Sequence, residues 1–452
     1  MKMRFYRAVG VFLLLFPFLP GQHLSSFHLS AQTYETQYRR PVSRVMEDVA
    51  RRFNVRFKFD ANVDTAGVTL TYADFRIRPY SLEQTLDNIC KHFDWNWWKQ
   101  SGNLYKIKRY EYARRHEDEG RQLLRYLSSL YSNEQQWEQR RALLRQDVRR
   151  LLAIDAFLDS CVPSPRPLLS AVRRHDGYTT QNICLELTPG QHVFGTIYSP
   201  DTRRYRRDPR FRSGFPLIIC PDGHWPSRYR ADEQQRLATL ARMGAICVDF
   251  DLYGYGQSAA EVGDHHTPRA HVFQAACGLR LLDYMLSTRT DIDTTRVAAC
   301  GGSGGGTHTV LLSLLDSRIT ASAPVVHVAS HFDGGCPCES GMPVQLAGGG
   351  TCEAELAAVI APRPLLLVSD GGDWTSTTPQ LEYPFLQRIY GFYGAGERVR
   401  NVHLPDEGHD FGPNKRQAVY QFFIDIFQLD PSQLDESRVT ILPEEQLRSK
   451  GM

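Results

Sequence analysis

Apolar runs and amphipathic runs alternate along the chain from residue 175 to residue 430. Short apolar runs are typical of buried strands, while apolar positions that recur every three or four residues indicate helices. Strands are predicted at residues 193–198, 217–220, 245–250, 297–300, 321–326, 365–369 and 402–404. Helices are predicted at 234–243, 270–286, 307–315, 383–393 and 417–427. This alternation predicts an α/β fold with a mostly parallel central sheet flanked by helices.

A separate, small α+β domain is predicted for residues 32–110. Its pattern indicates a helix at 42–53, strands at 55–59 and 68–72, a helix from Ser81 to about residue 93, and a hairpin at 95–107. Ser81 and Gln84 have the spacing of a capping box, which marks a helix start. Three tryptophans either cover the faces of this small sheet or form a platform on which sugars stack: Trp95, Trp97 and Trp98.

Two further segments flank the larger domain. Residues 111–174 interleave arginine and glutamate with leucine, so we expect a helical connector whose charges face solvent. Residues 431–452 are expected to form a C-terminal tail.

The first residues have the pattern of an export signal. Lys2, Arg4 and Arg7 give a basic start, residues 9–19 are apolar, and Ala31 precedes a plausible cleavage point. The apolar run is shorter than the roughly twenty residues that a membrane span needs, and no later run is long enough. We therefore expect a signal peptide at residues 1–31, no membrane span, and a periplasmic or secreted protein.

Charge gives no support for nucleic-acid binding. Of the 53 Lys and Arg residues three lie in residues 1–31, which leaves 50 against 50 Asp and Glu. Arginines do gather at residues 203–212, where a solvated loop is the simplest interpretation and contact with an acidic substrate is the alternative.

The ten cysteines allow disulfides in an exported protein. Cys220, Cys247 and Cys300 lie in apolar strand patterns and are expected to be buried thiols. A disulfide bond between Cys352 and the cysteine at residue 336 or 338 is an alternative for this Gly-rich loop. The Cys-Pro-Cys spacing is not that of a metal-binding pair, so no metal site is predicted.

Residues 301–305 read Gly-Gly-Ser-Gly-Gly between a predicted strand and a predicted helix. This is the context in which a G-x-S-x-G serine becomes a nucleophile. We expect the glycines beside Ser303 to prevent collision with the backbone, and the helix N-terminus to favour negative charge there. A linker would lack the flanking elements, and a phosphate loop would require a Lys-Ser or Lys-Thr ending.

A nucleophilic serine needs a base, and His409 follows the last predicted strand in a Gly-His turn. His265 and His266 are the rival candidates. The base needs an orienting carboxylate, for which Asp373 is preferred and Asp370 is the alternative, because the acid usually comes a few residues past the strand end. If neither serves, Asp333 or Glu353 would be considered.

The developing oxyanion must be met by fixed N–H groups. Gly304 follows the nucleophile directly and should supply one. The second is expected from the backbone of His224 or Trp225, in the loop after an early strand. This machinery requires no metal and no organic cofactor.

With these residues in place, residues 175–430 resemble the α/β-hydrolase superfamily. They look most like bacterial acetylxylan-esterase-like enzymes and the α/β-hydrolase type of pectin methylesterase. The resemblance is carried by residues 221–225, 251–258, 301–306, 331–339, 361–369, 372–375 and 408–409. Two departures are Asp222, where many relatives have histidine, and the additional aspartate in residues 369–373. The N-terminal domain resembles the short N-terminal domain of secretins and TonB-dependent receptors, which implies contact with an envelope protein.

The resemblance implies an exported serine esterase that removes acetyl or methyl groups from plant cell-wall polysaccharides such as pectin or xylan. A peptidase or dienelactone-type hydrolase is one alternative. A catalytically inactive binding or scaffold protein of the cell envelope is the other.

Overall fold

The computed structural model describes residues 40–59, 63–67, 69–70, 81–90, 93, 95–109, 117–163, 166–225, 227–265, 267, 269–330, 332, 339 and 344–449. The predicted signal peptide lies outside these residues. The chain forms two compact units, of which the first comprises Met1–Ile89 and Trp98–Lys106 and the second Cys90–Trp97 and Ile107–Met452. Among the described residues, the helices are all too short or too polar to span a bilayer.

The N-terminal elements follow the predicted order. They are β1 (Arg40–Pro41), α2 (Val42–Phe53), β2 (Arg56–Phe59), β3 (Thr69–Leu70), α4 (Leu82–Cys90), β4 (Trp95–Ser101) and β5 (Leu104–Arg109). Strand β1 pairs with β3, and the other three form a sheet in the order β2-β5-β4. The capping box is confirmed: the Gln84 N–H donates to Ser81 Oγ at 3.2 Å and the Ser81 N–H donates to Gln84 Oε1 at 3.1 Å. Trp95 is only 5% exposed, which fits a covering role.

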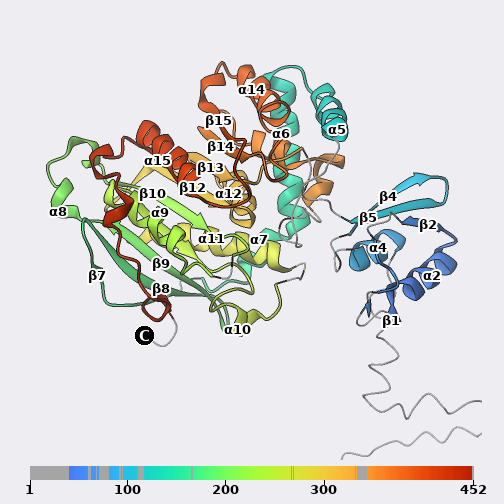
Figure 1. The fold of residues 1–452 in the computed structure, drawn as a ribbon, viewed down its shortest axis with the longest axis horizontal. Helices are drawn as coiled ribbons and strands as arrows, with labels where there is room; N and C mark the ends of the chain where they lie inside the picture. Colours follow the sequence, from blue (N-terminus) through green and yellow to red (C-terminus); the bar gives the residue numbers. More distant parts are fainter. Residues whose placement is uncertain are drawn as a thin grey trace, which may run out of the picture. The chain divides into compact units, whose positions relative to one another are not determined.

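A mixed sheet forms the centre of the second unit (Figure 1). Its strands are β6 (Leu168–Leu169), β7 (Arg173–Arg174), β8 (Tyr178–Thr188), β9 (Gln191–Pro200), β10 (Phe215–Pro221), β11 (Ile246–Phe250), β12 (Ile292–Gly302), β13 (Ala321–Val325), β14 (Leu365–Asp370) and β15 (Val399–Leu404). The order is β15-β14-β13-β12-β10-β11-β9-β8-β6, with β7 paired to β8. All pairs from β15 to β11 are parallel, and those beyond are antiparallel. The predicted mostly parallel sheet is confirmed.

Helices pack against this sheet (Figure 1). They are α8 (Thr202–Tyr205), α9 (Ala231–Arg242), α10 (Ala259–Val262), α11 (Arg269–Thr288), α12 (Gly304–Leu315), α13 (Glu353–Ala358), α14 (Glu382–Phe392) and α15 (Pro413–Phe427). The middle strands β10 and β11 are buried throughout. A parallel sheet covered on both faces needs such near-continuous apolar strands, because neither face meets water. The resulting rigid sheet brings the carboxyl ends of β10, β12 and β14 to one edge.

The predicted helical connector contains α5 (Glu117–Ser129), α6 (Glu134–Leu152) and α7 (Ile154–Asp159). The helical prediction is wrong for its last residues, because β6 and β7 pair with β8 in the central sheet. Trp137, Leu144 and Val148 are fully buried, so α6 packs into the core of the second unit. The expectation that the charges of this segment face solvent is wrong for Arg140. Its guanidinium is buried and holds both carboxylate oxygens of Glu355, at 2.9 and 2.8 Å, because an unpaired cation there would be costly.

The predicted C-terminal tail is also held on the second unit, and it includes α16 (Glu444–Leu447). The Leu447 side chain is fully buried. The buried Arg228 guanidinium donates to the Leu447 carbonyl at 2.8 Å, and the Asn182 amide donates to the Gln446 carbonyl at 2.8 Å. These bonds satisfy backbone groups that would otherwise be buried without partners.

Candidate active site

Ser303 stands in the sharp turn between β12 and α12. Its backbone has φ 55° and ψ −123°, a conformation that a residue with a side chain rarely adopts. The turn therefore stores strain, as functional turns often do. It places Ser303 Oγ at the N-terminus of α12, where the helix dipole favours negative charge.

The glycines around Ser303 make room for the loop that follows β10. A Cβ on Gly301 would lie 2.4 Å from the Pro221 carbonyl oxygen, and one on Gly305 would lie 2.3 Å from the same atom. Real Cβ atoms do not come so close to a backbone oxygen, so a side chain at either position would force the backbone to shift. The expectation that the glycines directly beside Ser303 avoid the backbone is wrong in this detail. A Cβ on Gly304 would instead meet the side chain of His224, at 2.6 Å.

His409 lies between Ser303 and Asp373. Its Nε2 atom is 2.9 Å from Ser303 Oγ, and its Nδ1 atom is 2.6 Å from Asp373 Oδ2. These side chains come from the ends of β12, β14 and β15, which meet at one edge of the sheet. The structure thus brings together the three side chains singled out from the sequence.

Thr375 and Lys415 hold this arrangement in place. The other oxygen of Asp373 accepts hydrogen bonds from the backbone N–H and the hydroxyl of Thr375, both at 2.6 Å. The fully buried Lys415 ammonium donates to the Gly408 carbonyl and to Asp410, both at 2.7 Å. The turn that carries His409 is therefore tied to α15.

Asp370, the alternative acid, has a different partner. Its carboxylate lies 3.3 Å from Lys415 Nζ. Burial and the nearby Asp373 carboxylate raise the pKa of Asp370, although the Lys415 ammonium opposes the shift. The geometry therefore favours Asp373 over Asp370 as the carboxylate that orients His409.

The remaining candidates lie elsewhere or outside the described residues. His265 contacts His224 rather than Ser303. Glu353 accepts from the backbone N–H of Ala329 at 3.0 Å. His266 and Asp333 are outside the described residues.

His327 also lies near the site. Burial lowers the pKa of His327 to about 4, so its imidazole is neutral near pH 7.

Two tryptophan rings lie beside His409. The Trp374 ring centroid is 4.5 Å from that of His409, and the Trp225 ring lies nearly parallel to it at 6.5 Å. The Arg230 guanidinium carbon lies 4.3 Å from the centroid of the Trp225 ring, in a cation–π contact. These rings restrict the orientation of the imidazole, which stays open to solvent.

The loop after β10 carries the predicted oxyanion donors. The His224 imidazole lies against Gly304, and the Trp225 ring lies against Gly302. The backbone of Gly223 is pressed toward the Gly302 carbonyl, because a Cβ there would come within 2.5 Å of that oxygen. Gly304, His224 and Trp225 therefore surround the same turn as Ser303.

Glu339 is a close neighbour of Ser303 that the sequence analysis missed. It is 3% exposed, and its Oε1 atom lies 3.0 Å from Ser303 Oγ and 3.1 Å from His224 Nδ1. His224 Nε2 is in turn 2.8 Å from His265 Nε2, and His265 Nδ1 contacts the Tyr253 carbonyl. The only signal in the sequence was the position of Glu339 in a segment that resembles other hydrolases.

The proton positions in this chain of groups follow from the Tyr253 carbonyl. A carbonyl can only accept, so His265 Nδ1 carries a proton and a neutral His265 accepts at Nε2. His224 then donates from Nε2. His224 Nδ1 lies 3.1 Å from Glu339 Oε1, so a protonated His224 forms an ion pair with this carboxylate. Ser303 therefore has two acceptors near its hydroxyl, Glu339 and His409.

Comparison with solved structures shows extensive similarity to one esterase. "Methylesterase BT1017" is 57% identical in sequence, with a TM-score of 0.73 over 93% of each chain. A putative acetyl xylan esterase from Bacteroides fragilis is 16% identical over 60% of this chain and 76% of that chain, with a TM-score of 0.47. A glucuronoyl esterase from Solibacter usitatus is 13% identical over 67% and 95%, with a TM-score of 0.48.

Searches of family models and of curated proteins give no match. The similarity to the methylesterase nevertheless extends over nearly the whole of both chains at high identity. The α/β-hydrolase fold and the ester-hydrolase activity expected from the sequence are confirmed. The chain belongs to the same family as methylesterase BT1017 and is a carboxylic ester hydrolase of the α/β-hydrolase fold.

Proposed function

We propose that this protein is an exported serine esterase that removes methyl groups from esterified uronic acids in plant cell-wall polysaccharides such as pectin. The observation that carries the proposal is the hydrogen-bonded series Ser303–His409–Asp373. The identity to a methylesterase favours a methyl over an acetyl group. The basic and apolar pattern of residues 1–31 supports export.

In this mechanism Ser303 Oγ attacks the ester carbonyl carbon while its proton passes to His409 Nε2. The Asp373 carboxylate holds the imidazole in the right tautomer and stabilises the imidazolium. Backbone N–H groups of Gly304 and of His224 or Trp225 stabilise the tetrahedral oxyanion. The bond to the methoxy group then breaks, and His409 gives its proton to the departing methoxide, which leaves as methanol.

Water completes the cycle on the acyl-enzyme. His409 takes a proton from the water, the resulting hydroxide attacks the acyl carbon, and the proton returns to Ser303 as the acid leaves.

Glu339 affects the first step of the reaction, the attack by Ser303. The Ser303 proton must be directed to His409 rather than to Glu339 before attack, and an ion pair with a protonated His224 makes Glu339 a weaker acceptor.

The released alcohol or acid distinguishes the substrates directly. We expect methanol from methyl-esterified polygalacturonate, little acetate from acetylated xylan, and no cleavage of aminoacyl anilides. Ser303→Ala should lower methanol release by roughly 10⁶-fold, because the nucleophile is lost. Acetate as the main product would contradict the methyl specificity, and anilide cleavage would favour a peptidase.

Asp373→Asn and Asp370→Asn form a matched pair. Asp373→Asn should lower kcat by roughly 10³–10⁴-fold, because the amide holds His409 in the wrong tautomer. Asp370→Asn leaves the contact between His409 and Asp373 intact, so its effect should be far smaller. Steady-state kinetics on one methyl ester would measure both, and equal losses in the two variants would contradict the assignment of Asp373.

Gly304→Ala and Gly305→Ala add the same methyl group to adjacent positions. The new Cβ at 304 meets the His224 ring, 2.6 Å from its Cε1 atom, so kcat should fall roughly tenfold to a hundredfold while the fold persists. The Cβ at 305 meets the Pro221 backbone carbonyl, so the loss of unfolding free energy should be about 1–3 kcal/mol. Urea unfolding and kinetics separate the two effects. A stable Gly305→Ala protein or a fully active Gly304→Ala protein would contradict this account of the turn.

A further inference from the structure

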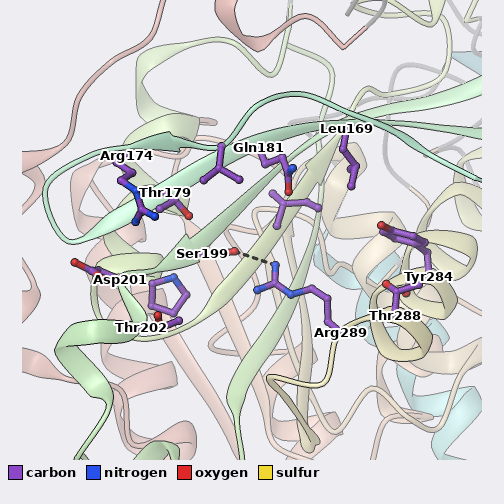
Figure 2. A pocket seen from close by; sticks show the side chains of 13 residues that line it. Leu169, Arg174, Thr179, Gln181, Ser199, Asp201, Thr202, Tyr284, Thr288 and Arg289 are labelled. Atoms are coloured by element: carbon purple, nitrogen blue, oxygen red, sulfur yellow. Dashed lines mark hydrogen bonds between the residues drawn. The ribbon is translucent and has the colours of Figure 1, made fainter.

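A hollow in the protein surface lies in the same unit as Ser303 but far from that residue. Its volume is about 390 Å³, and it lies among β7, β8, β9 and the end of α11 (Figure 2). Arg289, which lines the hollow, comes just before β12, whereas Ser303 comes just after it. Since β12 has 11 residues, its two ends are on the order of 30 Å apart. We call this feature the β8–β9 hollow.

The side chains of the β8–β9 hollow suit a sugar. Figure 2 shows Tyr284 and Thr288 of α11 on one side and Arg174, Thr179 and Asp201 on the other. The half-buried Tyr284 ring, with nearby aliphatic side chains, provides an apolar surface for the face of a sugar ring. Hydrogen-bonding groups for sugar hydroxyls come from Thr179, Gln181, Ser199, Thr202 and Thr288.

The charges of the hollow favour an acidic sugar. Arg289 is held by Asp291, at 2.9 and 2.6 Å, and by Ser199 at 3.0 Å. Asp201 is held by Arg203 at 3.0 Å through each oxygen. Among the described residues Arg174 forms no ion pair, although its charge acts on the Asp201 carboxylate. Its guanidinium is exposed at the rim and can therefore pair with a further carboxylate.

A second observation agrees with this charge balance. The arginine-rich run 203–212 begins directly after Thr202, which lines the hollow. Arg204 and Arg206 are exposed, and the Arg204 backbone N–H donates to the Asp201 carbonyl at 2.9 Å. The run therefore extends the positive surface outward from the rim. A polymer with repeated carboxylates would meet both the hollow and this surface.

We propose that the β8–β9 hollow is an accessory site that binds a uronate unit of an acidic polysaccharide. The Arg174 guanidinium pairs with the carboxylate, and the Tyr284 ring packs against the sugar. The choice of uronate rests on the proposed function, because removing a methyl group from a uronate ester leaves a carboxylate on the chain. The site holds de-esterified stretches of the polymer that the active site has released.

Binding can be measured without turnover. Ser303→Ala protein is titrated calorimetrically with a short oligogalacturonate and with a neutral xylo-oligosaccharide of equal length. Arg174→Ala is compared in this background with Arg398→Ala, which removes an exposed arginine next to β15, at the opposite edge of the sheet. Arg174→Ala should weaken oligogalacturonate binding by roughly tenfold or more, and Arg398→Ala should leave it unchanged.

Any of three other results would overturn the proposal. Equal affinities of the Arg174→Ala and Arg398→Ala proteins would mean that general charge attraction accounts for binding. Equal binding of the neutral oligosaccharide would remove the role of the carboxylate, and no binding of either sugar would remove the site. Because no ester is cleaved in this experiment, its failure is distinguishable from a failure of the proposed esterase activity, which methanol release tests.

Discussion

The contact between the Pro221 carbonyl and the turn at residues 301–305 is the constraint on which the site depends. Two glycines leave no Cβ where this oxygen lies, so the end of β10 can pack directly on the turn. The close packing has two consequences. It supports the strained backbone of Ser303, and it brings the loop with His224 and Trp225 beside the serine. The proposed nucleophile and oxyanion donors are therefore positioned by one backbone contact rather than by separate side-chain interactions.

The opposite side of the site is held by polar contacts. Asp373 is fixed by Thr375, while Lys415 ties down the turn with His409 and also neutralises Asp370. Such a shell matters because a base displaced by about 1 Å can lose roughly 10²-fold in rate. Glu339 adds a feature of its own, since a carboxylate 3.0 Å from Ser303 Oγ would compete for the proton unless its charge is reduced. An ion pair with a protonated His224, whose Nδ1 atom lies 3.1 Å from Glu339 Oε1, meets that requirement.

Much of this could be predicted from local sequence, and the limits have physical reasons. The Gly-x-Ser-x-Gly turn, the aspartate past β14 and the Gly-His turn after β15 are short-range patterns, so their residues could be named in advance. Glu339 could not, because its place near Ser303 depends on how a long loop folds. Strand β8 was missed because its polar and apolar residues do not form a simple apolar run. Buried charges such as Arg140 and Arg228 were assigned to solvent or left aside, since burial of a charge depends on a partner distant in sequence.

The central claim is that Ser303 is a nucleophile activated by His409. The most direct measurement is covalent labelling with a fluorophosphonate, followed by mass spectrometry of the intact protein and its peptides. We expect a single adduct on Ser303, formed roughly 10²–10⁴-fold more slowly in the His409→Ala protein because the general base is absent. An adduct on another residue, or an unchanged rate in that variant, would contradict it.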